Sequence, residues 1–185
     1  FAVREAQGEY LLFLNNDVEI ITENWLEEML QLCQQKDVGM VGAKLYYPDD
    51  TIQHAGVVVG LGGVAAHVLC KLPRDAEGYM GRLRCVQEIS AVTAACMMVK
   101  TSVFKAVGGF DEELKVAFND IDLCMKVRKY GVKIVFTPYA ELYHYESKSR
   151  GMEDTPEKQL RFSREVNCFR RKWERELLKG DPYYN

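Results

Sequence analysis

The sequence lacks the features that mark membrane-spanning, disulfide-stabilised and nucleic-acid-binding proteins. Its longest apolar stretch, residues 55–70, contains four glycines and one histidine, and it is shorter than the roughly 20 apolar residues that a membrane-spanning helix requires. The six cysteines are scattered without a Cys-x-x-Cys pair, which argues against a zinc site and against a redox motif. The net charge is −3, so the chain as a whole has no excess of positive charge that would attract a nucleic acid.

What the chain has is the composition of a folded domain. Its 185 residues are 48% hydrophobic and 28% charged, which suffices for one domain with a sizeable core. Most cysteines lie within apolar runs, where a thiol behaves as a small hydrophobic group, and we expect them to be reduced, in a cytoplasmic protein. The chain begins without a methionine and without a signal-peptide pattern, so we expect it to be a piece of a longer protein.

Apolar runs that alternate with helix-like segments indicate an α/β domain. The continuous run Tyr10–Leu14 is typical of a strand that is buried on both faces in a mostly parallel sheet. Further strands are predicted at residues 38–45, 57–61, 92–99, 133–137 and 141–145, and helices after Thr22, from Thr101 or Ser102, at residues 119–130 and at residues 156–178. The helix at residues 119–130 has complete boundary signals, with Asn119 as its predicted N-cap and Gly131 as its end.

Three polar residues, Asn15, Asn16 and Asp17, directly follow the first predicted strand. In open α/β sheets, ligands bind outside the carboxyl ends of the strands, so Asp17 stands where a ligand site is expected. A carboxylate there can hold a divalent cation that bridges two phosphates, since Mg²⁺ and Mn²⁺ prefer oxygen ligands. The alternative is a polar turn without a ligand.

Asp120 lies at the start of the helix predicted at residues 119–130. An acid in the first turn of a helix is close to free backbone N–H groups and to the positive end of the helix dipole, which favour its charged form. A carboxylate held in this way can act as a general base that takes a proton from a hydroxyl group. The alternative is simple helix capping, which accounts well for Asn119 and Asp122 and less well for Asp120.

His144 lies at the end of the last predicted strand, within Leu142-Tyr-His-Tyr145. A neutral imidazole is a common ligand of transition metals, although a histidine among aromatic residues can also be a packed core residue. We interpret Gln53 and His54, which follow the turn at residues 48–50, as a surface turn rather than as a loop that faces a substrate.

Together, these motifs resemble those of glycosyltransferase family 2, and in particular its bacterial members. The stretch Gly8-Glu-Tyr-Leu-Leu-Phe-Leu-Asn-Asn-Asp17 is similar to the end of the family's nucleotide-binding half. In this stretch Asn15 replaces the first acid of the family's Asp-x-Asp-type motif, which leaves fewer charges to hold an ion. Asp17 matches the last acid, which contacts the metal in the family.

Three later stretches resemble the acceptor-side half of the family. They are Ala91–Val99, Gly108–Glu112 and Phe118–Cys124. Asp120 falls at the position of the family's catalytic base. His144 falls where a downstream histidine completes the metal site in related members.

The resemblance implies part of a GT-A fold, with a mixed, mostly parallel sheet flanked by helices and a long C-terminal helix. The family's N-terminal half, which holds the base and the ribose of the donor, is not in this sequence. We expect residues 1–147 to be the C-terminal portion of the GT-A domain, and residues 148–185 to be a linker and a helix packed on that domain.

The activity implied by the resemblance is the transfer of a sugar from a nucleotide-diphosphate donor to a hydroxyl of a saccharide or lipid-linked acceptor, with inversion, in bacterial surface polysaccharide synthesis. Asp120 is then the catalytic base, Asn15, Asn16 and Asp17 bind the cofactor, and Asp17 and His144 hold Mg²⁺ or Mn²⁺. Two alternatives are a nucleotidyltransferase on a related fold and a catalytically inactive carbohydrate-binding or scaffolding fragment.

The predicted C-terminal helix concentrates positive charge. Residues 156–179 contain eight basic and four acidic residues, a local charge of +4 in a chain of net −3. The helix either presents a solvated basic face or contacts an anionic partner, such as a lipid-linked diphosphate or an anionic membrane surface. The predicted location is therefore the cytoplasm or the inner face of the plasma membrane.

Overall fold

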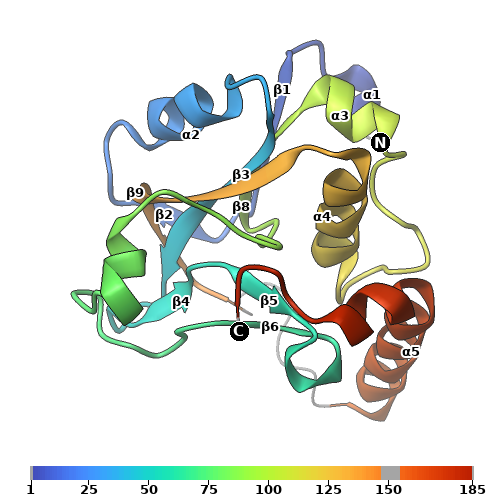
Figure 1. Ribbon diagram of the computed structural model, residues 1–185. Helices are drawn as coiled ribbons and strands as arrows, with labels where there is room; N and C mark the ends of the chain where they lie inside the picture. Colours follow the sequence, from blue (N-terminus) through green and yellow to red (C-terminus); the bar gives the residue numbers. More distant parts are fainter. Residues whose placement is uncertain (1, 147–154, 185) are drawn as a thin grey trace.

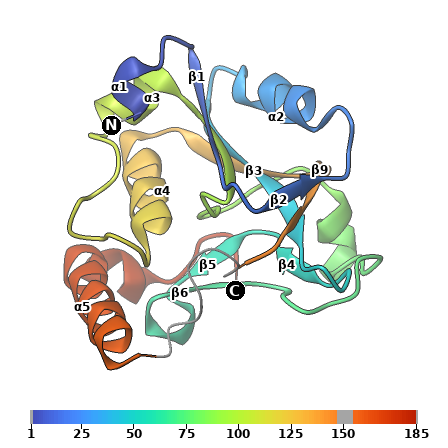
Figure 2. The same ribbon diagram turned by 180° about the vertical axis from the view of Figure 1, so that it is seen from behind.

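A mixed β-sheet forms the centre of the computed structural model, which describes residues 2–146 and 155–184. The main path of the sheet runs through β1 (Tyr10–Leu14), β8 (Cys96–Lys100), β3 (Val38–Tyr46), β9 (Lys133–His144) and β2 (Val18–Ile20), in that spatial order (Figure 1). Two short strands lie beside this path, β4 (Ile52–His54) next to β3 and β7 (Gln87–Glu88) next to β9. A separate hairpin is formed by β5 (Val57–Val59) and β6 (Ala65–His67), which lie near the C-terminal end of the chain in Figures 1 and 2.

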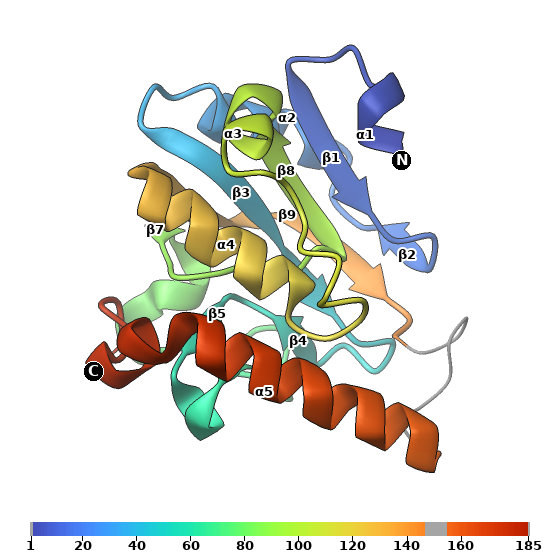
Figure 3. The ribbon, with the colours of Figure 1, turned by 90° about the vertical axis from the view of Figure 1, so that its right-hand side faces the viewer.

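Helices cover both faces of the sheet, as Figure 3 shows from the side. The helix α2 (Trp25–Cys33) packs on one face, where Met29 and Cys33 are fully buried against β3, β8 and β9. The other face is covered by α3 (Thr101–Ala106), α4 (Asn119–Tyr130) and α5 (Pro156–Lys179). The remaining helical segments are α1 (Ala2–Glu5) and the 3₁₀ turns η1 (Leu61–Gly63) and η2 (Tyr79–Arg84).

The predicted mixed sheet is confirmed, but the expectation that it is mostly parallel is wrong for the described residues. Among the strand pairs of this part of the chain, only β3 and β9 run parallel, and every other pair is antiparallel. The prediction failed because a strand between two helical layers has a continuous apolar sequence whichever way its neighbours run. The strand β1 also has only β8 beside it, and it is only partly buried.

Three parts of the strand prediction need correction. Residues 133–137 and 141–145 form one strand, β9, which continues through Pro138 because its pairing register with β3 shifts between Phe136 and Glu141. The strand predicted at residues 92–99 begins only at Cys96, since the Ala94 N–H donates to the Asp120 carboxylate (3.1 Å). The strand predicted at residues 57–61 ends at Val59.

The bounds of the helices were predicted better than the residues that cap their N-termini. The helix α4 has the predicted bounds and ends at Gly131, which has the left-handed backbone conformation of a C-terminal cap. Its N-cap, however, is Phe118, and Asn119 is already helical. Thr22 does not cap α2, because its hydroxyl accepts the Glu141 N–H (3.2 Å) and the helix begins at Trp25.

The long C-terminal helix begins at Pro156, as predicted, and two of its aromatic residues face the core. Thr155 caps it by accepting the Lys158 N–H (3.3 Å), while Phe169 and Trp173 are buried in the core on the α4 side of the sheet. The predicted boundary at residue 147 lies outside the described residues, so the division into a domain and a linker stays a prediction. Within the described residues, no helix combines the length and the apolarity of a bilayer span.

Candidate active site

The topology brings the ends of two strands to one edge of the sheet. The strand β1 is antiparallel to β8, β8 is antiparallel to β3, and β3 is parallel to β9, so β1 and β9 run in the same direction. Asn15 follows the end of β1, and His144 is the last residue of β9. Their side chains meet, with Asn15 Nδ2 3.0 Å from His144 Nε2.

Asp17 lies beside this pair, at the start of β2. Its carboxylate Oδ1 is 3.3 Å from His144 Nε2, and both side chains are nearly buried, with 13% and 11% of their surfaces exposed. The backbone carbonyl of Asp17 accepts the Tyr145 N–H (2.8 Å), which fixes the turn next to β9. Asp17 and His144 therefore lie in contact, while their shared role as metal ligands stays a prediction.

The contacts of the His144 ring determine where its proton lies. Nδ1 is 2.7 Å from Gln53 Oε1, which can only accept, while Gln53 Nε2 donates to the His144 carbonyl (3.1 Å). The proton is therefore on Nδ1, and Nε2 directs its lone pair toward Asn15 and Asp17. Asp17 Oδ1 is buried and has no hydrogen-bond donor among the described residues, so an oxygen and a nitrogen lone pair converge there.

This convergence is a fit for a divalent cation. A buried carboxylate oxygen without a donor is costly unless a positive group faces it, and an oxygen and an imidazole nitrogen are both accepted ligands of Mn²⁺. The described residues contain no cluster of three or more His, Cys, Asp or Glu side chains suited to a metal. Two protein ligands with substrate phosphates are, however, a common arrangement for such ions.

Asp120, in the first turn of α4, lines the same cavity. Its Oδ2 accepts the Ala94 N–H (3.1 Å), and its Oδ1 accepts the Ile121 N–H (2.8 Å). These two bonds hold the carboxylate at the N-terminus of α4, where the helix dipole also favours negative charge. Asn119 accepts the Asp120 N–H (2.7 Å).

The cavity itself has a volume of about 420 Å³. Its walls contain all the predicted site residues, together with others that the sequence motifs did not indicate. The lining residues are Asn15, Asn16, Asp17, Thr93, Ala94, Ala95, Val116, Asn119, Asp120, His144 and Glu146. The prediction that Asp17, Asp120 and His144 converge on one cleft is thus confirmed, while their chemical roles stay predictions.

The interpretation of Gln53 and His54 as a surface turn is wrong. Both side chains are buried on β4, where Gln53 contacts His144 and the His54 Nδ1 atom lies 2.9 Å from His67 Nδ1. Burial, reinforced by His67 and His144, lowers the pKa of His54 well below its usual value. A smaller cavity of about 80 Å³ adjoins the first one here, and Thr93, His144 and Glu146 line both.

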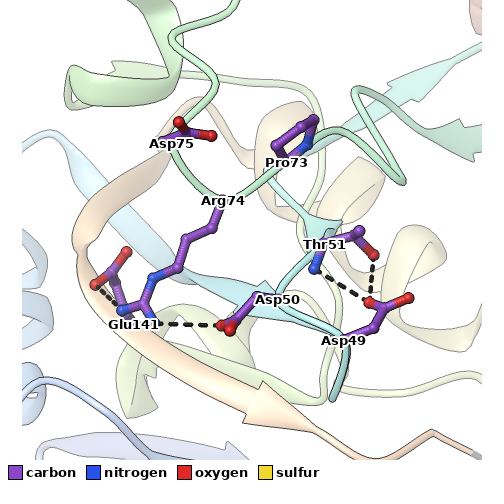
Figure 4. Close-up of a pocket in the computed structure, with 7 residues that line it drawn as sticks. All are labelled: Asp49, Asp50, Thr51, Pro73, Arg74, Asp75 and Glu141. Carbon is purple, nitrogen blue, oxygen red and sulfur yellow. Dashed lines mark hydrogen bonds and ion pairs between the residues drawn. The ribbon is translucent and has the colours of Figure 1, made fainter.

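A larger surface cavity, of about 590 Å³, contains none of the predicted residues (Figure 4). Its Arg74 side chain is paired with Asp50 (3.4 Å) and Glu141 (3.1 Å), and Asp49 accepts hydrogen bonds from Thr51. Because these charges satisfy one another, the cavity has a structural explanation, and the cavity around Asp17 and Asp120 is the better candidate.

Comparison with known proteins gives consistent results. A model of the family described as "Glycosyltransferase like family" matches residues 1–165. The uncharacterized protein y4gI of Sinorhizobium fredii is 56% identical over 185 residues, which are 100% of this chain and 20% of that protein. The O-antigen biosynthesis protein RfbC of Myxococcus xanthus is 39% identical over 186 residues, which are 100% of this chain and 14% of that protein.

The chain therefore spans about a fifth or less of the length of these curated relatives. Among solved structures, that of GalNAc-T7 with UDP, GalNAc and Mn²⁺ is similar with a TM-score of 0.60 at 13% sequence identity, over 84% of this chain and 31% of that chain. At this identity the likeness shows a shared fold.

Proposed function

Because the chain belongs to the glycosyltransferase-like family and has the GT-A fold of its structural neighbours, we propose that the protein transfers a sugar from a nucleotide-diphosphate donor to a hydroxyl group. The acceptor is a saccharide or a lipid-linked saccharide, and the anomeric configuration is inverted. The observation that carries this proposal is the single cavity in which Asp17, Asp120 and His144 meet.

Asp120 is the general base of the proposed reaction. Each of its oxygens accepts one backbone N–H, so each keeps lone-pair capacity for a hydroxyl proton. As the acceptor oxygen bonds to the anomeric carbon, its proton passes to Asp120, and the bond from that carbon to the diphosphate breaks. A single displacement of this kind inverts the anomeric centre.

Asp17 and His144 are the residues that would hold Mn²⁺ or Mg²⁺, and the mixed oxygen and nitrogen donor set favours Mn²⁺. When bound, the ion supplies positive charge that neutralises the departing diphosphate. Gln53 keeps the His144 proton on Nδ1, so Nε2 is an acceptor. In the structure Nε2 accepts from Asn15 Nδ2 (3.0 Å), a bond that an ion on Nε2 would replace. Asn15 and Asn16 line the cavity beside these ligands, where we place the donor phosphates.

The acceptor and the location follow from the relatives and from the thiols. The name of the O-antigen biosynthesis relative supports an acceptor in bacterial surface polysaccharide synthesis. All six cysteines are free, which supports a cytoplasmic location, since disulfides are rare there. Contact with the inner face of the plasma membrane is part of the same proposal and rests on the basic residues of α5.

The test is a donor screen with the whole protein that contains this chain. Nucleotide sugars would be incubated with candidate acceptors and Mn²⁺, and the released nucleotide and the linkage of the product would be determined. We expect a nucleoside diphosphate and an inverted linkage. Release of pyrophosphate would instead identify a nucleotidyltransferase, and no turnover with any donor would favour an inactive binding or scaffolding domain.

A further inference from the structure

A buried carboxylate on α5 holds the loop that leads to Asp120. Glu165 is only 3% exposed, and its Oε1 accepts the backbone N–H groups of Lys115 (3.0 Å) and Val116 (3.1 Å). Its Oε2 accepts the N–H of Ala117 (2.9 Å). A buried carboxylate needs such compensation, and hydrogen bonds to a charged group are stronger than those between neutral groups.

One of the residues held by Glu165 forms part of the candidate active site. Val116 lines the cavity that contains Asp120. Phe118 follows with a positive φ of 63°, a conformation that is unusual for a bulky residue. Its ring packs against Phe162 and Phe169 of α5, with ring centroids 5.8 and 5.3 Å away. Contacts with α5 thus fix both the side chain and the backbone of this loop.

The same helix also holds the first turn of α4. Asp122 is fully buried, and its Oδ1 accepts from Trp173 Nε1 (2.8 Å) and Lys172 Nζ (2.7 Å) of α5. Figure 3 shows α5 lying alongside α4. Asp120 therefore lies between two points, residues 115–117 and Asp122, that are both attached to the C-terminal helix.

From these contacts we propose that Glu165 is a positioning residue for the transfer reaction. Its carboxylate holds residues 115–117 so that Val116 forms a wall of the cavity and Asp120 keeps its orientation toward the acceptor hydroxyl. This role rests on the proposed function, since it assigns Asp120 to the acceptor. It predicts that loosening Glu165 slows the chemical step while the donor, on the Asp17 side of the cavity, binds as before.

The variant Glu165→Gln tests this proposal in the whole protein. A glutamine of the same shape keeps one acceptor oxygen and replaces the other by an NH₂ group, which cannot accept an N–H. The matched control is Glu174→Gln, which makes the same charge change at an exposed position of the same helix. A second variant, Glu165→Asp, keeps the charge and shortens the side chain, in case the glutamine variant folds poorly.

Two measurements separate positioning from general stability. Hydrogen exchange of the Lys115, Val116 and Ala117 amides should become about 10- to 100-fold faster in Glu165→Gln, the effect of losing a charge-assisted hydrogen bond, while amides in the middle of α4 keep their rates. In the same variant kcat should fall about 10-fold or more, with an unchanged dissociation constant for the donor. The control should match the wild type in both measurements.

The possible outcomes distinguish a failure of the positioning role of Glu165 from a failure of the proposed transfer function. Wild-type exchange rates at residues 115–117 in both Glu165 variants would overturn the positioning role, and so would faster exchange with unchanged kcat. A wild-type protein that transfers no sugar would refute the proposed function instead, and in that case the exchange rates still decide whether Glu165 holds the loop.

Discussion

Two backbone N–H groups hold the Asp120 carboxylate in the cavity, one from Ala94 and one from Ile121. In the whole protein, Asp120→Asn should therefore reduce transfer about 10²- to 10⁴-fold, the usual effect of losing a general base. Donor affinity should hardly change, because asparagine has the same shape as aspartate and because Asp120 is not one of the proposed metal ligands. Turnover assays and calorimetric donor titrations measure the two effects. The exposed Asp75, changed to asparagine, is the control, and a near-normal kcat in Asp120→Asn would remove Asp120 from the mechanism.

Asp17 has a different expected effect because its unpartnered Oδ1 faces His144 Nε2. We expect Asp17→Ala to weaken Mn²⁺ and donor binding together, each by at least about 10-fold. The backbone bond from Tyr145 to the Asp17 carbonyl does not need the side chain, so the fold should persist. Titration of Mn²⁺ with and without donor gives both affinities. Unchanged Mn²⁺ affinity would show that Asp17 only shapes the turn.

At the residue scale, the sequence indicated those members of the site that follow a strand or begin a helix. Asp17, Asp120 and His144 were predicted because strand ends meet at one edge of a sheet. Gln53 and Glu165 were not assigned any role in the site, because their effects depend on contacts with residues 91 and about 50 positions away. Its spacing, three residues after Phe162 and four before Phe169, places Glu165 on the apolar face of the helix, but only the fold shows that its carboxylate accepts the backbone N–H groups of residues 115–117.

Among the elements, helices with strong local signals were predicted best. The helices α4 and α5 begin at their predicted residues. For α5 the start follows from a proline in the first turn, whereas the cap predicted for α4, Asn119, is already helical. The continuity of β9 through Pro138 could not be predicted, since it depends on the register shift against β3. The same holds for strand direction, because helices on both faces produce the same apolar runs in parallel and antiparallel strands.

The helix α5 divides its basic residues between two surfaces. Lys172 pairs with Asp111 and Asp122, and Arg170 Nε donates to the Gly63 carbonyl (2.9 Å). Arg164, Arg171 and Arg175 are exposed. We propose that contact with an anionic membrane surface would involve these three residues.

We expect the protein to sediment with anionic vesicles at low salt and much less at high salt. Changing all three exposed arginines to alanine should weaken this binding by about 3 kcal/mol, since each basic residue contributes about 1 kcal/mol near an anionic surface. Vesicles of neutral lipid are the control. Equal binding to neutral and anionic vesicles, or binding to neither, would leave α5 with a packing role only.

For the molecule as a whole, buried His54 makes stability depend on pH. Burial, together with the neighbouring imidazoles of His67 and His144, lowers its pKa well below its usual value. In the unfolded chain the same imidazole takes up a proton near its ordinary pKa of about 6.5. Below that pH the unfolded state binds the additional proton, so the free energy of unfolding should fall as the pH falls, by up to about 1.4 kcal/mol per unit.

Denaturant unfolding at pH values between 8 and 5 measures this dependence. The variant His54→Gln has no imidazole at this position, so its free energy of unfolding should fall less steeply between about pH 6.5 and 5. The comparison uses slopes, because the substitution itself changes stability. Identical slopes in the two proteins would contradict the assignment of the effect to His54.

Segments that pair in the folded chain are synthesised at different times. Tyr10 lies opposite Lys100, and Val38 opposite Lys133, while Phe169 and Trp173 complete one side of the core. Chains are synthesised from the amino end at about 5–20 residues per second, so on the order of ten seconds separates the synthesis of β1 from that of the helix that completes this side of the core. During that interval we expect the nascent polypeptide to expose apolar strands that α5 covers in the folded chain, a state that is prone to aggregation.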